Sequence, residues 1–173
     1  MSKIQIQETK KADTRALDLE KGERLKQSDV KCDTELHIEA VKLCGDFLCD
    51  KIKEQFKAHD HTKLGEYLPA FTKALSTGFK GKEFKGLDWW EIHLTERHHL
   101  NDKVPEDVNL IDVLEMICDC VSAGMARTGT VYDVTLSNET LKKAFKNTVK
   151  LIKDNIEVVP PDEDNEVVKK LLK

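Results

Sequence analysis

Residues that break or cross-link a chain are scarce in this sequence. Its 173 residues include 4 Pro and 8 Gly, and aromatic residues make up 6% of the total. Together with 35% charged and 39% hydrophobic residues, this composition argues against a β-sandwich and against a disordered tract. The length suits one domain better than two. We expect a polar N-terminal extension over residues 1–30, an all-α domain over 31–157 and a C-terminal tail over 158–173.

Long apolar runs and paired cysteines are missing as well. No stretch approaches the roughly 20 apolar residues that span a bilayer, and the first residues lack the apolar core of a signal peptide. An odd cysteine count without any C-x-x-C spacing argues against a disulfide framework and a zinc ribbon. We therefore expect a cytoplasmic protein with no membrane partner, whose free thiols are buried as small hydrophobes. The five cysteines are Cys32, Cys44, Cys49, Cys118 and Cys120.

An excess of positive charge is also absent, since the formal net charge is -4. Proteins that bind duplex nucleic acid by neutralising its phosphates depend on such an excess, so this class is not expected. A small anionic ligand stays compatible with the sequence, because one metal ion can outweigh the global charge locally.

Apolar periodicity predicts a first helix that is capped by Asp33 or Thr34. Apolar residues recur on one of its faces from Leu36 to Leu48. On a helical wheel His37 falls near the middle of this apolar arc, one turn before Val41. The side chain of His37 is therefore predicted to face inward.

Three further helices are predicted along the chain. One begins near Asp88, after a basic loop over residues 76–88, and reaches His98-His99. The next, over about 109–125, is apolar around most of its circumference and is expected to be mostly enclosed. The last covers about 138–155. The strongly polar strip of the 109–125 helix has the spacing i, i+3, i+7 and consists of Asp112, Glu115 and Asp119.

Side chains of the kind that bind metals occur in a definite order along these segments. Unpaired ionisable groups in apolar surroundings are costly, and a bound divalent cation would compensate them. Nitrogen and carboxylate ligands without sulfur favour Mn, Fe, Co, Ni or Zn. The ordered residues are His37, His59, Asp60, His93, His98, His99 and Asp119.

This interpretation requires the chain to turn back between His37 and His59. An unbroken helix would separate the two residues by about 33 Å, beyond the reach of one metal ion. Gly45-Asp46, or the polar stretch from Asp50 onwards, is the expected break. The enzymatic interpretation depends on this convergence in space.

The order H, HD, H, HH, D resembles the HD superfamily of metal-dependent phosphohydrolases. The stretch HDHTKL from His59 is similar to the HD-x-x-K signature of some members. Together with IHLTERHH from Ile92 and VNLIDVLEMICDCVSAGMARTG from Val108, it resembles an uncharacterised family of small phage and bacterial HD-type proteins. The resemblance covers about Asp33 to Gly129 and implies an HD-domain-like helical bundle. Lys57 and Ala58 depart from the apolar residues that usually precede the HD pair.

By this resemblance, one or two divalent metal ions would be bound. The first would be held by His37, His59, Asp60 and Asp119. A second would add histidines that lie between the HD pair and the last aspartate, which are His93 and either His98 or His99. Neighbouring residues point about 100° apart on a helix, so one of the last two is expected to be a ligand and the other a solvent or substrate contact.

The resemblance further implies a phosphohydrolase that acts on a small phosphorylated metabolite, with a nucleotide as the first expectation. Water held between two metals would attack phosphorus. Lys63 would bind the substrate phosphate. Glu66 and Glu115 would orient ligand imidazoles or transfer protons. The Gly-Tyr-Pro extension of cyclic-dinucleotide phosphodiesterases is absent, which counts against that substrate.

Ordinary structural roles stay open for the same residues. His37 can be a satisfied core histidine, and His59 can interact with a helix dipole. Asp119 can pair with Arg97 or Arg127.

Two other functions also stay open, namely a two-iron oxygenase on the same scaffold and a non-catalytic protein that binds a metal and a nucleotide or protein partner. The terminal VVKKLLK can dock on its own domain, on a second subunit in a homo-oligomer, or nowhere.

Overall fold

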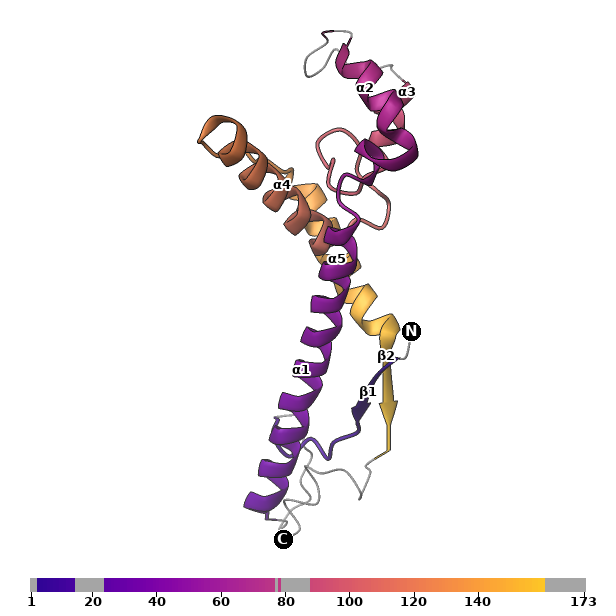
Figure 1. Cartoon of the computed structure of the whole chain (residues 1–173). Helices are drawn as coiled ribbons and strands as arrows, with labels where there is room; N and C mark the ends of the chain where they lie inside the picture. The colour runs from indigo at the N-terminus through magenta and orange to yellow at the C-terminus, as the bar shows by residue number, and fades with distance from the viewer. Residues whose placement is uncertain (1–2, 15–23, 77, 79–87, 161–173) are drawn as a thin grey trace. The chain divides into compact units, whose positions relative to one another are not determined.

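The computed structural model describes residues 3–14, 24–76, 78 and 88–160 and is mostly helical (Figure 1). The chain divides into two compact units, one formed by residues 1–50 and 151–173 and the other by residues 51–150. The basic loop predicted over residues 76–88 lies largely outside the described residues. In chain order the elements are β1 (Ile4–Gln7), α1 (Gln27–Lys57), the short 3₁₀ helices η1 (His61–Lys63) and η2 (Gly65–Tyr67), α2 (Leu68–Ser76), α3 (Asp88–His93), α4 (Leu110–Thr128), α5 (Asn138–Asn155) and β2 (Ile156–Val159).

The first unit brings together segments that the sequence assigned to an extension and to the domain's end. Strand β1 pairs in parallel with β2, with Ile4 opposite Ile156 and Gln7 opposite Val159. Asp33 is buried inside α1 and does not cap it, and its Oδ2 accepts a hydrogen bond of 2.7 Å from the backbone N–H of Ala12. The N-terminal segment is therefore tied into this unit by backbone pairing and by the hydrogen bond to Asp33. Its alternating Ile-Gln-Ile-Gln is the short strand pattern that the expected polar extension did not take into account.

Helix α1 runs without a break from Gln27 to Lys57. The predicted turn at Gly45-Asp46 is wrong, because both residues lie within the helix. Helix formers continue on both sides of Gly45, and one glycine costs a helix only about 1 kcal/mol.

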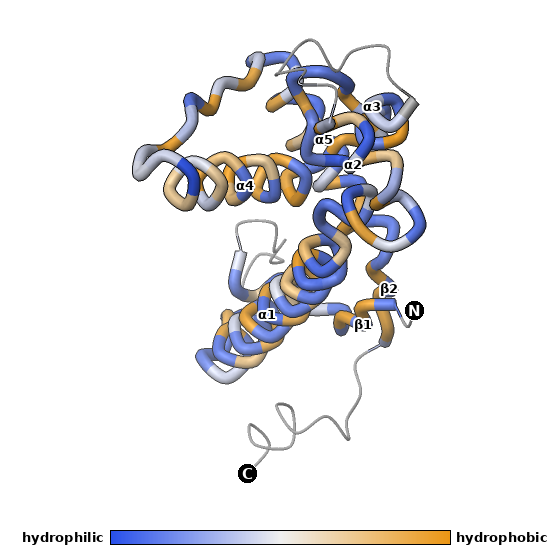
Figure 2. The backbone as a smooth tube through the Cα atoms, turned by 45° about the horizontal axis from the view of Figure 1, so that its top comes forward, coloured by the Kyte–Doolittle hydropathy of each residue, from blue (hydrophilic) through white to orange (hydrophobic). Residues whose placement is uncertain are grey.

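Helix α4 begins at the cap that its sequence provides. Asn109 accepts a hydrogen bond from the backbone of Ile111, and Asp112 accepts one from the backbone of Asn109. Gly129 ends the helix in the left-handed conformation at φ 72°. Figure 2 shows hydrophobic positions recurring along α4 between hydrophilic ones. The predicted enclosure is wrong, because the described residues leave an apolar face exposed, formed by Leu114, Ile117, Val121 and Met125.

Helix α5 confirms the predicted range of 138–155. Ala144 on α5 packs in a core with Leu100, Val108 and Met116. The Thr148 hydroxyl accepts a hydrogen bond of 2.8 Å from the backbone N–H of Leu110 at the start of α4. This core holds α4 in place behind the polar side chains described below.

None of the described helices is both long enough and apolar enough to cross a membrane.

Candidate metal centre

Three side chains that we call site A meet just beyond the end of α1: His59, Asp60 and Asp119. His59 Nε2 lies 3.5 Å from Asp60 Oδ2 and 3.5 Å from Asp119 Oδ1. The other ring nitrogen, Nδ1, lies 2.9 Å from Glu115 Oε1. A carboxylate can only accept here, so Nδ1 carries the hydrogen and Nε2 presents its lone pair to the two aspartates. One oxygen or nitrogen of each site A residue falls within 4.8 Å of the others.

A second group, site B, consists of His93, His98 and His99. One ring nitrogen from each of the three imidazoles falls within 4.8 Å of the others. His93 Nε2 lies 2.7 Å from His99 Nε2. Two imidazole nitrogens this close can share a proton or can direct both lone pairs at one cation. Helix α3 ends at His93, so His98 and His99 follow in turns and do not diverge as they would on a helix.

Asp60 faces both sites with different oxygens. While Oδ2 is directed at His59, Oδ1 lies 3.9 Å from His93 Nε2 and 3.8 Å from His98 Nε2. The Oδ1 atom and both ring nitrogens of His98 are buried and make no hydrogen bond, although His98 Nδ1 lies 3.4 Å from Glu115 Oε1. Buried polar atoms without partners are uncommon and call for an explanation such as an ion.

The backbone at Asp60 is in the left-handed conformation, at φ 56° and ψ 24°. Residues other than glycine rarely adopt it, although aspartate and asparagine tolerate it best. Such strain costs of order 1 kcal/mol or more and tends to occur at functional positions. Here the conformation turns the chain away from α1 and carries the Asp60 side chain between sites A and B.

A chain of hydrogen bonds holds His59 from behind. Gln55 in the last turns of α1 donates to Glu115 Oε2 at 2.7 Å and to Asp112 Oδ1 at 2.8 Å. Arg97 donates to both oxygens of Asp112, at 2.7 and 2.8 Å. Asp112 and Glu115, which the sequence left open as a solvated strip, are thus buried and paired. Arg97 pairs with Asp112 and not with Asp119.

A second set of hydrogen bonds holds His93. The Thr62 hydroxyl donates to Glu96 Oε1 at 3.0 Å and lies 2.7 Å from His93 Nδ1. Because its proton is used on Glu96, Thr62 accepts from His93 Nδ1, and the lone pair of His93 Nε2 is left on the side that faces Asp60 and His99. The Thr62 carbonyl in turn accepts a hydrogen bond of 2.9 Å from the indole N–H of the buried Trp89, which supports this arrangement.

The environment keeps the groups in the protonation states that metal binding requires. Burial and the neighbouring His99 lower the pKa of His93 to about 3, and burial and His98 lower the pKa of His99 to about 4. Burial opposes ionisation of Glu115, but His98, Gln55 and His59 lower its pKa to about 2. Both imidazoles are thus neutral and Glu115 is ionised at neutral pH.

Lys63 lies within the centre. Its Nζ is 2.6 Å from Asp60 Oδ2. Burial would raise the pKa of Asp60, yet the hydrogen bond and the charge of Lys63 lower it. The ammonium group therefore balances the charge of the carboxylate that both sites share.

The prediction that His37 is a metal ligand is wrong. His37 is an exposed residue of α1 and belongs to the first unit, whereas all other predicted ligands belong to the second. About 30 Å of continuous helix separates it from Lys57 at a rise of about 1.5 Å per residue. Its neighbours Ile38 and Val41 are also exposed, although Leu36 is buried, so the surface around His37 itself is uncovered among the described residues.

The structure brings the six other predicted ligands close together, and His98 and His99 both lie in site B, so the choice between them as the metal ligand stays open. Glu115 orients an imidazole as predicted, whereas Glu66 hydrogen-bonds to no histidine. Glu96 has the orienting position instead, and sequence reasoning missed it. No helical period pointed to it, because Glu96 lies in the turns that follow the end of α3 at His93.

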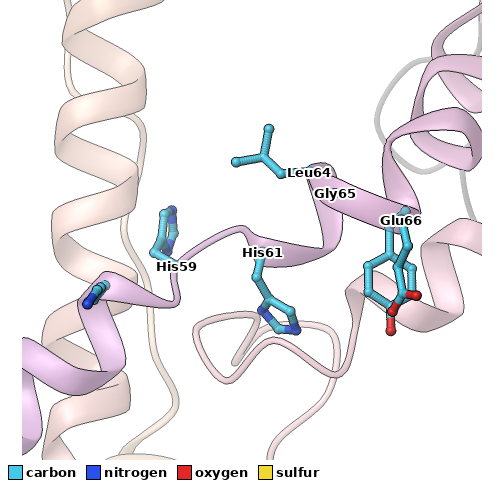
Figure 3. Close-up of a pocket in the computed structure, with 7 residues that line it drawn as sticks. His59, His61, Leu64, Gly65 and Glu66 are labelled. Atoms are coloured by element: carbon cyan, nitrogen blue, oxygen red, sulfur yellow. The ribbon is translucent and has the colours of Figure 1, made fainter.

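A pocket with a volume of about 370 Å³ opens beside site A (Figure 3). His59 belongs to both the pocket and the site, so a molecule in the pocket reaches the centre directly. The other lining residues are Lys57, His61, Leu64, Gly65, Glu66 and Tyr67.

The chain matches no family model, no curated protein and no solved structure. Its resemblance to the HD superfamily thus stays a prediction from the motifs.

Proposed function

We propose that the second unit is a divalent-metal-dependent phosphohydrolase of HD-like helical architecture, acting on a small phosphorylated metabolite such as a nucleotide. The observation that carries the proposal is the position of Asp60. Its two oxygens face two groups of metal-type ligands, and one of these oxygens is buried without a partner beside the unpartnered His98. A carboxylate between two sites is the arrangement that holds paired metal ions.

The ligands define the class of metal. Site A offers one imidazole and two carboxylates, and site B offers three imidazoles, with Asp60 between them. Imidazole and carboxylate groups without sulfur suit Mn, Fe, Co, Ni or Zn. The expected convergence of His37 with His59 fails, because α1 is continuous, so the proposal rests on the six ligands of the second unit alone. Site A then has three protein ligands, a number typical of catalytic sites that keep a position open for water. Bound there, the metal would supply an activated water and would stabilise negative charge on phosphate oxygens.

The chain's own residues provide the remaining functions. Glu115 holds the tautomer of His59, and Thr62 with Glu96 holds that of His93. Lys63 lies on the Asp60 oxygen that faces site A. A cation on that oxygen competes with the ammonium group, which then becomes available to bind a phosphate oxygen next to the site. This gives Lys63 the phosphate-binding role that the HD-x-x-K signature implies.

Metal binding and hydrolysis are tested together on the full chain. The protein is stripped with a chelator and then loaded separately with Mn, Fe, Co, Ni or Zn. Free metal at about 100 times its dissociation constant stabilises a protein by about 2.7 kcal/mol, so a clear rise in melting temperature is expected. Phosphate release is then measured with a panel of phosphomonoesters and phosphodiesters.

Substitutions connect these effects to the centre. Asp60→Asn removes the shared carboxylate but places there a residue that also tolerates the left-handed backbone conformation. Asp119→Asn removes the second carboxylate of site A. Both are expected to abolish phosphate release while the protein stays folded by circular dichroism. Asp133→Asn, at an exposed position away from the centre, is the matched control. A wild-type protein that gains no stability from any of the metals contradicts the proposal, and oxygen uptake by the iron-loaded protein without phosphate release favours the oxygenase instead.

A further inference from the structure

The pocket beside site A has two chemically different ends. Figure 3 shows His59 at one end and Glu66 at the other, with His61 and Leu64 between them. Lys57, the last residue of α1, also lines the pocket. Its ammonium group makes the end beside His59 and site A suited to an anion, whereas Glu66 makes the other end suited to hydrogen-bond donors.

Two charged side chains of the pocket, Lys57 and Glu66, have no partner within the described part of the chain. Lys57 and Glu66 are exposed, and neither makes an ion pair or side-chain hydrogen bond with a described residue. Leu64 is 64% exposed on the same pocket. A cation, a carboxylate and an apolar side chain that line one pocket without partners are suited to a ligand with an anionic, a hydroxylated and an apolar part.

The wall between the two ends is held in place. His61 Nδ1 lies 2.9 Å from Glu96 Oε1 and 3.1 Å from the Ala58 carbonyl. Its ring meets that of Tyr67 edge to face, with centroids 6.5 Å apart. Gly65 has a φ of 56°, a conformation that glycine adopts without strain. These contacts fix the turn that carries Leu64 and Glu66.

We infer that this pocket binds a nucleoside monophosphate, with the phosphate at the Lys57 and His59 end and the ribose hydroxyls on Glu66. The inference rests on the proposed function, because the phosphate is placed where site A can act on it. A volume of about 370 Å³ is near the lower end of the usual range of about 300–1,000 Å³ for small-molecule pockets. This volume suits a mononucleotide better than a dinucleotide, and Leu64 contacts the base.

Binding is measured by calorimetry on the metal-loaded full chain with nucleoside 5′-phosphonates, whose P–C bond resists hydrolysis. Each ribonucleoside compound is compared with its 2′,3′-dideoxy form. Hydrogen bonds to a charged group contribute about 1.5–3 kcal/mol, so the wild-type protein is expected to bind the ribose form at least about tenfold more tightly. In Glu66→Gln this ratio is expected to fall close to one, whereas in Glu106→Gln, at an exposed position outside the pocket, it keeps the wild-type value.

Lys57→Ala tests the other end of the pocket. It is expected to weaken binding of the ribose and dideoxy forms by the same factor, on the order of tenfold, because it removes a contact to the shared phosphonate. Lys142→Ala, an exposed lysine of α5, is the control.

The results separate the inference from the proposed function. Binding that depends on Glu66 and Lys57, without any release of phosphate from the nucleotides, supports the pocket and contradicts the hydrolase. Release of phosphate from simple esters, with no phosphonate binding or with a ribose preference that survives in Glu66→Gln, overturns the pocket and keeps the hydrolase. If the protein neither binds the phosphonates nor releases phosphate, the pocket inference and the proposed hydrolase are both overturned.

Discussion

His98 Nε2 lies 3.8 Å from Asp60 Oδ1, and both atoms are buried without a hydrogen-bond partner. A distance of this size is too long for a hydrogen bond. It is compatible with two ligands on the same cation, since each ligand atom would lie about 2 Å from the metal. Left unpaired, these atoms lower the stability of the protein.

Replacement of His98 by leucine is therefore expected to stabilise the metal-free protein. An unsatisfied buried polar group costs about 1–3 kcal/mol, and His98→Leu removes one such atom, Nε2, whereas Nδ1 lies 3.4 Å from Glu115 Oε1. The same variant is expected to lose most of the metal-induced rise in melting temperature, because site B loses a ligand. Urea denaturation in the presence of a chelator and thermal melts with added metal measure the two effects.

His37→Leu is the matched control, since His37 is exposed and lies outside both sites. This control is expected to keep the full response to metal. Should His98→Leu be less stable without metal and still respond like the wild type, the interpretation of site B is wrong.

Gln55 is expected to tune the metal affinity although it is not a ligand. It donates to Glu115 and Asp112, and Glu115 holds His59. Gln55→Met leaves both carboxylates with one partner fewer, so Glu115 holds the His59 ring less firmly. Loss of such outer partners typically costs 10–100-fold in metal affinity, and a similar loss is expected in a metal titration followed by calorimetry.

The neighbouring Glu54→Met is the control for this prediction. Glu54 is exposed and forms a surface ion pair with Lys51, and such a pair contributes about 0–1 kcal/mol. Its removal is expected to leave metal affinity unchanged. Equal affinities of the two variants would show that Gln55 does not position the site.

Local sequence signals correctly predicted one helix and one helix cap. The 138–155 helix and the cap of α4 at Asn109 follow from periodicity and from side chains that satisfy the first backbone N–H groups. The helix that contains His37 was predicted to begin at Asp33 or Thr34, whereas it begins at Gln27. The predicted break is absent, because a single glycine or a polar stretch does not have to end a helix when the surrounding residues favour helix.

Residue chemistry predicted the centre better than helical geometry did. Six of the seven predicted metal ligands meet in the second unit, since buried histidines and acids need partners wherever the chain places them. The orientation of His37 was inferred from a helical wheel alone. A wheel shows which residues share a face of the helix, but it does not show whether other parts of the chain pack against that face. Glu96 and Thr62 escaped notice because their roles depend on turns after α3 and beside η1 that no period encodes.

The metal-free protein is expected to lose stability as the pH falls from 6.5 to 4.5. The pKa of His93 is lowered to about 3 and that of His99 to about 4, so both stay neutral in the folded state over this range. The unfolded chain binds more protons there, since an unperturbed histidine has a pKa near 6.5. Stability therefore rises with pH, and the slope approaches about 1.4 kcal/mol per pH unit for each histidine. Urea midpoints measured at several pH values in chelator test this.

His99→Gln is expected to reduce this slope by about half, because only one of the two neutral histidines then remains. Glu115, with a pKa of about 2 against an ordinary value of 4.5, contributes stability that is lost only below this window. A stability that is flat from pH 6.5 to 4.5 would mean that the two histidines are not buried as neutral groups.

Two glycines in helices are expected to respond to alanine in opposite directions. A Cβ at Gly124 in α4 would lie 2.5 Å from the Thr130 carbonyl oxygen and 2.6 Å from the Tyr132 nitrogen, so the returning chain would have to shift. Such overpacking costs about 1–3 kcal/mol, more than the gain of up to about 1 kcal/mol in helix propensity. At Gly45 in α1 a Cβ would meet no atom within 4 Å, so Gly45→Ala keeps that gain in full. Denaturant unfolding is therefore expected to show a lower free energy for Gly124→Ala and a higher one for Gly45→Ala, and a loss at Gly45 would contradict the continuous helix.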